Sequence, residues 1–165
     1  MGYAKASGIP YEIIFHKNSY VGRTFIKPTQ EERENSVRIK LNILEPAVRG
    51  KRIVLVDDSI VRGTTMKNLI RMLKQAGAKE VHVRVSSPPF LFPCYFGTDV
   101  PSNKQLIASS HSVEEICREI GADSLGYMPV EDLEEMAGGL PLCTACFTGN
   151  YPMDVPDGEI KDALE

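Results

Sequence analysis

The chain has 165 residues, which is enough for one domain with a real hydrophobic core. Charged residues make up 25% of it and the formal net charge is −3, which argues against a protein that coats nucleic acid or an anionic membrane. No apolar run reaches the roughly 20 residues that a membrane span requires, and the N-terminus lacks the pattern of a signal peptide. These features predict a cytoplasmic globular protein with no nucleic-acid or membrane partner.

The first part of the chain predicts a helix end, a strand and a longer helix. Residues 2–7 have the composition of a last helical turn closed by a glycine. The apolar run "YEIIF" at 11–15 predicts a strand. Residues 28–44 predict a helix, because Thr29 and Glu32 have the spacing of a capping box.

The remaining elements alternate between strands and helices. The run "RIVLV" predicts a strand buried on both faces, and the alternating "EVHVRV" predicts another. A helix is expected over 64–76, where apolar residues recur at helical spacing, and a second begins at the capping box of Ser112 and Glu115. Short strands are expected at 106–110 and 124–128. This alternation predicts an α/β fold with a mostly parallel sheet.

Two adjacent aspartates, Asp57 and Asp58, follow the strand "RIVLV" directly. Like charges side by side repel, so the pair costs free energy unless a cation or hydroxyl groups accompany it. Ligands of open α/β sheets bind beyond the carboxyl ends of the strands. The loop Ser59–Gly63 and the helix expected from Thr64 offer N–H groups and hydroxyls suited to a phosphate. The carboxylates suit ribose hydroxyls and Mg²⁺, so the stretch predicts a sugar-phosphate site.

A plainer interpretation of the two aspartates is a strand followed by a capped loop with solvated carboxylates. For an isolated pair of aspartates it would be the better interpretation. It leaves the sequence "RGTT" at Arg62–Thr65 unexplained.

The motif "VLVDDSIVRGTT" resembles the phosphoribosyl diphosphate (PRPP) binding motif of type I phosphoribosyltransferases. Four further segments, "NSYVGRTFIKPTQ", "SSPP", "LIASSHSVEEICREIGAD" and "CTACFTGNYP", resemble the amidophosphoribosyltransferase family more narrowly. The resemblance implies an α/β fold of the type I phosphoribosyltransferase kind, with a mostly parallel sheet and truncated at its N-terminus. We expect a partial phosphoribosyltransferase domain over 1–149, with the PRPP motif at 53–65, and an acidic tail over 150–165.

The resemblance also implies roles for the motif and for a lid loop at about 16–40. Asp57 and Asp58 would contact the ribose hydroxyls and the Mg²⁺ shell. The 5′-phosphate would be held, mostly through the backbone, by the next seven residues: Ser59, Ile60, Val61, Arg62, Gly63, Thr64 and Thr65. The lid residues that would face the pyrophosphate leaving group are Lys17, Tyr20, Arg23 and Lys40. Without the resemblance, a solvated basic loop would be the better interpretation of the lid.

The family's reaction displaces pyrophosphate from C1 of PRPP with ammonia and gives 5-phosphoribosylamine for purine biosynthesis. The ammonia comes from glutamine through an N-terminal glutaminase domain with an N-terminal cysteine. This chain starts Met-Gly-Tyr and has no such cysteine, so alone it is expected to be inactive. The resemblance further implies a homo-oligomer in the full-length form.

The cysteines give a second, weaker signal. Cys143 and Cys146 form a C-x-x-C, which suits one edge of a metal or cluster site but equally a redox pair or two unrelated thiols. In the resemblance, Cys94, Cys143 and Cys146 match three of the four ligands of a [4Fe–4S] cluster, and the fourth lies outside this chain. Cys117 is expected to be a packed thiol. Such a cluster would pin the C-terminal segment to the rest of the protein.

Two other functions compete with this interpretation. A nucleobase-salvage phosphoribosyltransferase would share the PRPP motif but would not be expected to carry "CTACFTG" or "NSYVGRT". A non-catalytic regulator that senses PRPP and binds nucleic acid would call for a basic patch, and the net charge of −3 argues against one.

Overall fold

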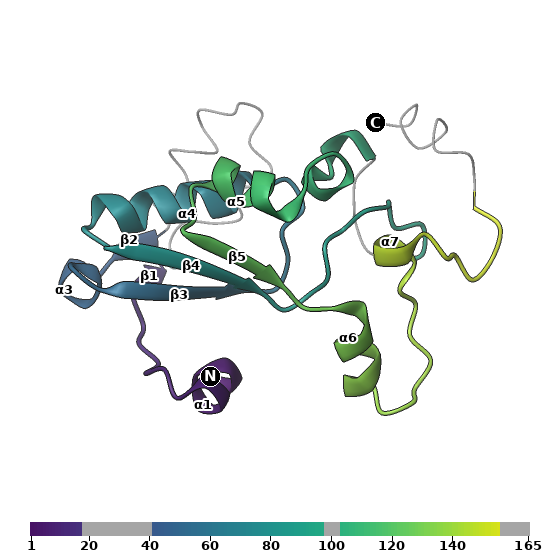
Figure 1. The fold of residues 1–165 in the computed structure, drawn as a ribbon, viewed down its shortest axis with the longest axis horizontal. Helices are drawn as coiled ribbons and strands as arrows, with labels where there is room; N and C mark the ends of the chain where they lie inside the picture. The colour runs from purple at the N-terminus through teal and green to yellow at the C-terminus, as the bar shows by residue number, and fades with distance from the viewer. Residues whose placement is uncertain (18–40, 98–102, 156–165) are drawn as a thin grey trace. The chain divides into compact units, whose positions relative to one another are not determined.

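The structure contains a three-stranded sheet (Figure 1). Its strands are β3 (Arg52–Asp57), β4 (Glu80–Val85) and β5 (Ser124–Tyr127), in the order β3-β4-β5. β4 and β5 are parallel, with His82 opposite Ser124 and Val85 opposite Tyr127. Because the chain combines this sheet with helices, the predicted α/β class is confirmed. The computed structural model describes residues 1–17, 41–97 and 103–155.

The described residues divide into two compact units. The first falls within 1–53 and 71–80, and the second within 54–70 and 81–165. β3 and the helix α4 (Thr64–Gln75) each contribute residues to both units. Among the described residues, no helix is long and apolar enough to cross a membrane.

The first unit contains a short antiparallel strand pair. Its elements are α1 (Gly2–Ser7), β1 (Phe15–Lys17), β2 (Leu41–Ile43) and α3 (Glu45–Val48). In the pair, Lys17 lies opposite Leu41, so the two ends of the segment 18–40 are neighbours. α1 ends at Gly8 in the left-handed conformation, as the sequence predicts.

Two predictions in this unit need correction. The strand expected at 11–15 begins only at Phe15, and it ends at Lys17. The helix expected over 28–44 lies mostly outside the described residues, and Leu41–Ile43 at its end is the strand β2. Pairing with β1 accounts for the second error, because a partner distant in sequence overrides the local helical pattern.

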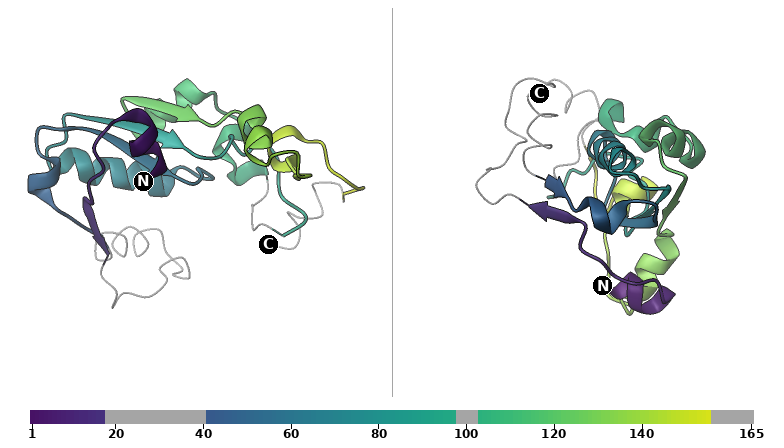
Figure 2. Two further views of the ribbon diagram at one scale, coloured as in Figure 1. Left: turned by 90° about the horizontal axis from the view of Figure 1, so that it is seen from below. Right: turned by 90° about the vertical axis from the view of Figure 1, so that its left-hand side faces the viewer.

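In the second unit, the helix α5 (Val113–Ile120) and the first turns of α4 lie on one face of the sheet (Figures 1 and 2). Alternate residues of β4 point into this layer and are fully buried. The apolar core of the unit includes Met66, Ile70, Val81, Val83, Val85, Leu106, Ile116 and Ile120. The predicted elements β3, α4, β4, α5 and β5 are thus all present.

The strand expected at 106–110 is wrong. Ile107–Ser109 form a 3₁₀ turn, preceded by a second one at Asn103–Gln105. The N–H of Ile107 donates to the carbonyl of Val61 at 2.9 Å, so it is not available to a sheet ladder. Three short helices were not predicted from the sequence: α3, α6 (Val130–Met136) and α7 (Ala145–Thr148).

Candidate phosphate-binding site

The two aspartates lie where β3 ends and the loop to α4 begins. The carbonyl of Asp57 accepts hydrogen bonds from the N–H and the hydroxyl of Ser86, at 3.0 and 3.2 Å. These bonds tie the carboxyl end of β3 to the residue that follows β4. Asp57 Oδ1 accepts from the N–H of Asp58 at 3.0 Å, and Asp58 Oδ1 accepts from the hydroxyl of Ser59 at 3.3 Å. The pair therefore lies at the edge of the sheet where ligands bind in folds of this class.

The pKa of Asp57 is higher than that of an ordinary aspartate. Burial raises its pKa above the usual value, and the hydrogen bond from the N–H of Asp58 partly opposes this. The neighbouring carboxylate of Asp58 raises the pKa further by repulsion. A cation or a hydroxyl donor beside the pair would favour the ionised forms. The pair is thus electrostatically suited to a ligand that brings one.

The loop between the aspartates and α4 is held from its inner side. Ile60 is only 3% exposed, and the carbonyl of Val61 accepts the N–H of Ile107. Gly63 is buried at φ +77°, and its carbonyl accepts the N–H of Lys67 at 2.9 Å in the first turn of α4. A Cβ on Gly63 would lie 3.0 Å from Ile107 Cδ1. The positive φ and this close approach both favour glycine at this position.

The outer side of the loop is polar and exposed. Asp58, Arg62, Thr64 and Thr65 all face solvent. In the described part of the chain, no backbone carbonyl accepts from the N–H groups of residues 59–65. The loop leads into a helix of twelve residues that has no acidic residue in its first turn. Free N–H groups and a helix N-terminus together form a cradle for an anion.

The nine residues predicted to bind PRPP run from Asp57 at the end of β3, through the loop 58–63, to Thr64 and Thr65 at the start of α4. The roles of the predicted lid residues stay predictions. Lys17 is in β1 of the first unit. Tyr20, Arg23 and Lys40 lie outside the described residues, so their roles stay predictions.

Two adjacent carboxylates fit Mg²⁺ only as a partial ligand set. Within the described residues there is no group of three or more His, Cys, Asp or Glu side chains that could hold a metal ion. Mg²⁺ commonly keeps several waters and binds through one or two carboxylates together with substrate phosphates. Asp57 and Asp58 therefore suit a Mg²⁺ ion that arrives with a phosphorylated ligand.

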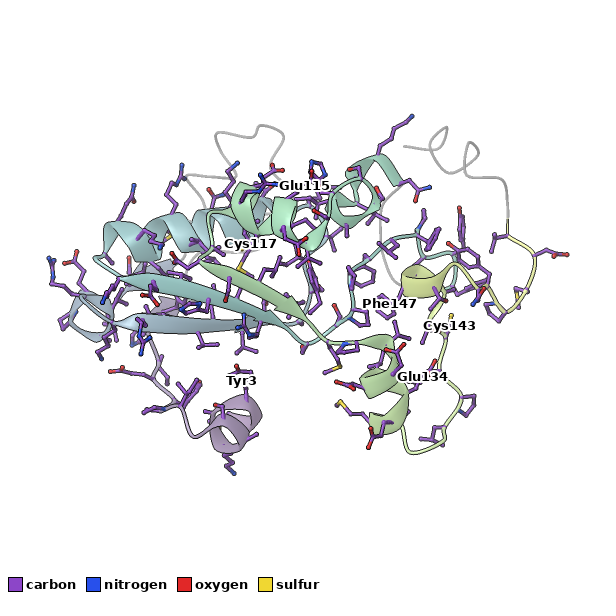
Figure 3. All side chains as sticks on the ribbon, in the orientation of Figure 1. Tyr3, Glu115, Cys117, Glu134, Cys143 and Phe147 are labelled. Atoms are coloured by element: carbon purple, nitrogen blue, oxygen red, sulfur yellow. The ribbon has the colours of Figure 1, made fainter. Side chains whose placement is uncertain are left out.

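Three of the cysteines gather around α7, away from the sheet. Cys94 and Cys146 are half-buried and Cys143 is exposed. Burial raises the pKa of Cys146 to about 11, and repulsion from Cys94 and Cys143 contributes, so the three thiols are near neighbours. Cys117 lies apart from Cys143, on α5, and its thiol donates to the carbonyl of Ala122 (Figure 3).

Thiolates of a [4Fe–4S] cluster bind separate irons, so they stand further apart than the ligands of a single ion. Three neighbouring thiols with soft sulfur donors are compatible with one side of such a cluster. Among the described residues, these three thiols do not form a site for a single metal ion.

A cavity that sequence reasoning missed lies next to the loop. Its volume is about 500 Å³, and its lining includes Arg62 of the motif together with Lys104, His111 and Glu119. Glu119 is 4.0 Å from Lys67 Nζ and 3.9 Å from His111 Nε2. No local signal could have revealed it, because its residues come from three separate segments.

The comparisons with known proteins show the family of this chain. A family model described as the phosphoribosyl transferase domain matches residues 7–87, which include the whole loop. An amidophosphoribosyltransferase of Archaeoglobus fulgidus is 56% identical over 98% of this chain and 36% of its own length. The enzyme of that name from Pyrococcus horikoshii is 57% identical over 92% of this chain and 33% of its own length.

Solved structures give the same result. Glutamine PRPP amidotransferase from Bacillus subtilis, complexed with ADP and GMP, superposes with a TM-score of 0.80 at 55% identity, over 93% of this chain and 35% of that chain. This chain thus spans about a third of the length of the relatives it matches. The chain belongs to the amidophosphoribosyltransferase family, and its loop from Asp57 to Thr65 lies in the phosphoribosyl transferase domain of that family.

Proposed function

We propose that this chain supplies the PRPP-binding part of an amidophosphoribosyltransferase of purine biosynthesis. The observation that carries the proposal is the turn from Asp57 to Thr65. This stretch connects two carboxylates at the carboxyl end of β3 with the N-terminus of α4, and these groups support the proposal. The same nine residues were proposed from the sequence as the PRPP motif.

The chemical groups of PRPP match the two ends of the loop. The vicinal ribose hydroxyls would donate to the carboxylates of Asp57 and Asp58. The 5′-phosphate would accept from the free N–H groups of residues 59–65 and from the exposed hydroxyls of Thr64 and Thr65. Such bonds fix the sugar between two points, so its C1 would be held in one orientation.

In a protein of the relatives' full length, ammonia released from glutamine would attack C1 of the bound sugar. The C1–O bond would break, pyrophosphate would leave with the bonding electron pair, and the attacking nitrogen would lose one proton to water to give 5-phosphoribosylamine. The contribution of this chain is positioning and charge stabilisation, and neither requires a nucleophile or a strong base in the loop. Mg²⁺ bound at the aspartates would neutralise charge on the substrate.

A structural [4Fe–4S] cluster is the second part of the proposal. Cys94, Cys143 and Cys146 would supply three thiolates, and a fourth ligand would come from outside this chain. Anaerobic addition of iron and sulfide to the reduced chain, followed by absorption spectroscopy, tests this. Replacing Cys143 by Ser should reduce cluster formation, whereas Cys117→Ser should leave it unchanged.

The proposed PRPP site is tested by calorimetric titration of the chain with PRPP and Mg²⁺. The double variant Asp57→Asn/Asp58→Asn should bind PRPP more than about tenfold more weakly, because hydrogen bonds to charged groups contribute roughly 1.5–3 kcal/mol each. Its thermal midpoint should stay the same or rise, because burial and repulsion both disfavour the ionised Asp57.

A matched control removes two adjacent negative charges elsewhere. Glu131 and Asp132 are exposed in the first turn of α6. The variant Glu131→Gln/Asp132→Asn should bind PRPP like the wild type. Equal binding by the wild type and the Asp57/Asp58 variant would overturn the assignment of the site.

A further inference from the structure

An aromatic contact surface joins the two segments that carry Cys94 and Cys146. We call it the aromatic clamp, and its members are Phe90, Phe92, Tyr95, Phe96, Phe147 and Tyr151. The first four lie within four residues of Cys94, and the last two follow Cys146 within five residues. Figure 3 shows Phe147 and Cys143 beside α7.

Tyr151 makes the most contacts in the clamp. Its ring packs edge-on against Tyr95 with centroids 5.4 Å apart, and it is tilted against Phe96 at 6.2 Å. Both distances are within the range of about 4.5–7 Å typical of aromatic pairs. Its hydroxyl donates to the carbonyl of Pro93 at 2.8 Å, across 58 positions of sequence. One side chain thus binds the residues on both sides of Cys94.

The second half of the contact involves the main chain of Cys146 itself. Its carbonyl accepts from the N–H groups of Leu91 and Phe92, at 2.9 and 3.0 Å. Phe147 packs against Phe90 with ring centroids 5.0 Å apart. A Cβ on Gly149 would come within 3.1 Å of the ring of Phe92, so the backbone approaches this ring closely.

None of these contacts involves a metal. We propose that the aromatic clamp, with Tyr151 as its main positioning residue, assembles the two cysteine-bearing segments before any metal binds. This reverses the role that the sequence suggested, in which a cluster pins the C-terminal segment. The thiols would then lie close together before a cluster binds. Folding of the chain would already have closed the long segment between Cys94 and Cys143.

The consequence for a cluster rests on the proposed cysteine ligands, but the clamp itself does not. Hydrogen exchange in the reduced, metal-free chain tests the clamp directly, at the amides of Leu91 and Phe92. In the wild type they should exchange at least about a hundredfold more slowly than in an unfolded peptide. Anaerobic addition of iron and sulfide should add little protection.

Variants at Tyr151 test its positioning role. Tyr151→Leu should speed exchange at both amides by about tenfold or more. Tyr151→Phe keeps the ring contacts and loses the bond to Pro93, so its exchange should fall between the two. Tyr11→Leu, at an exposed tyrosine of the first unit, is the control and should match the wild type.

Unprotected amides in the metal-free wild type that become protected only with iron and sulfide would overturn the proposal. So would wild-type exchange in Tyr151→Leu. If Tyr151→Leu does not fold, amide protection at Leu91 and Phe92 in the metal-free and the iron-treated wild type still tests the proposal. PRPP binding is measured separately, so a failure of the clamp leaves the proposed function standing.

Discussion

At the scale of single residues, the candidate site depends on apolar and small side chains as much as on polar ones. Ile60 is buried beneath the loop, and Gly63 closes against Ile107. These contacts hold the inner side of the loop, while Arg62, Thr64 and Thr65 are exposed. A loop that becomes ordered only on binding loses conformational entropy, and this loss lowers its affinity. A loop held in place before binding avoids that loss.

Gly63 offers a matched test of that rigidity. Gly63 and Gly121 have the same φ of +77°, but a Cβ meets Ile107 at the first and nothing within 4 Å at the second. Gly121→Ala should lower the free energy of unfolding by about 1–2 kcal/mol through backbone strain alone. Gly63→Ala should cost about 1 kcal/mol more, through overpacking. Urea unfolding measures both, and equal costs would mean that Ile107 yields freely and does not hold the loop.

At the scale of elements, α5 shows how local chemistry determines a helix end. The hydroxyl of Ser112 accepts from the N–H of Glu115 at 3.3 Å, and the Glu115 carboxylate accepts from the N–H of Ser112 at 2.8 Å. Gly121 closes the other end in the left-handed conformation. Both signals are written in the sequence, so this helix was predicted correctly from its start to its end.

The same cap gives a pH prediction. The hydrogen bond from the Ser112 N–H lowers the pKa of Glu115 below 4.5, and the hydroxyl of Ser112 contributes. The stabilisation is therefore present above the unfolded pKa and is lost as the pH falls through the folded pKa. Glu115→Gln keeps the cap geometry without the charge, so it should be less stable than the wild type at neutral pH. The difference should shrink as the pH falls below about 4.5.

Urea unfolding at neutral pH and at about pH 3 measures this difference. A difference that is equal at both pH values would show that the charge of Glu115 does not stabilise α5.

Elements that depend on distant partners could not be predicted in this way. Leu41–Ile43 has a helical pattern but pairs with β1, and the N–H of Ile107 bonds Val61, far away in sequence. The same limit applies to the site. The aspartates and the threonine-rich turn were visible in the sequence, because they are contiguous. The cavity at Arg62 and the aromatic clamp were not, because each joins segments far apart in the chain.

At the scale of the whole molecule, the chain spans about a third of the length of the relatives it matches. It contains the whole stretch from Asp57 to Thr65. The nine residues proposed to bind PRPP, together with β3 and α4, lie within the chain. The proposed binding step therefore depends on contacts inside this chain.

Amide NMR spectra of the labelled chain, recorded with and without PRPP in the presence of Mg²⁺, test the binding step at the level of individual residues. Shifts should concentrate on the amides from Asp57 to Thr65 and on Ser86, which bonds Asp57. They should disappear when Mg²⁺ is removed with a chelator. Shifts centred elsewhere in the chain, or none at saturating PRPP, would contradict the assignment of this loop as the PRPP site.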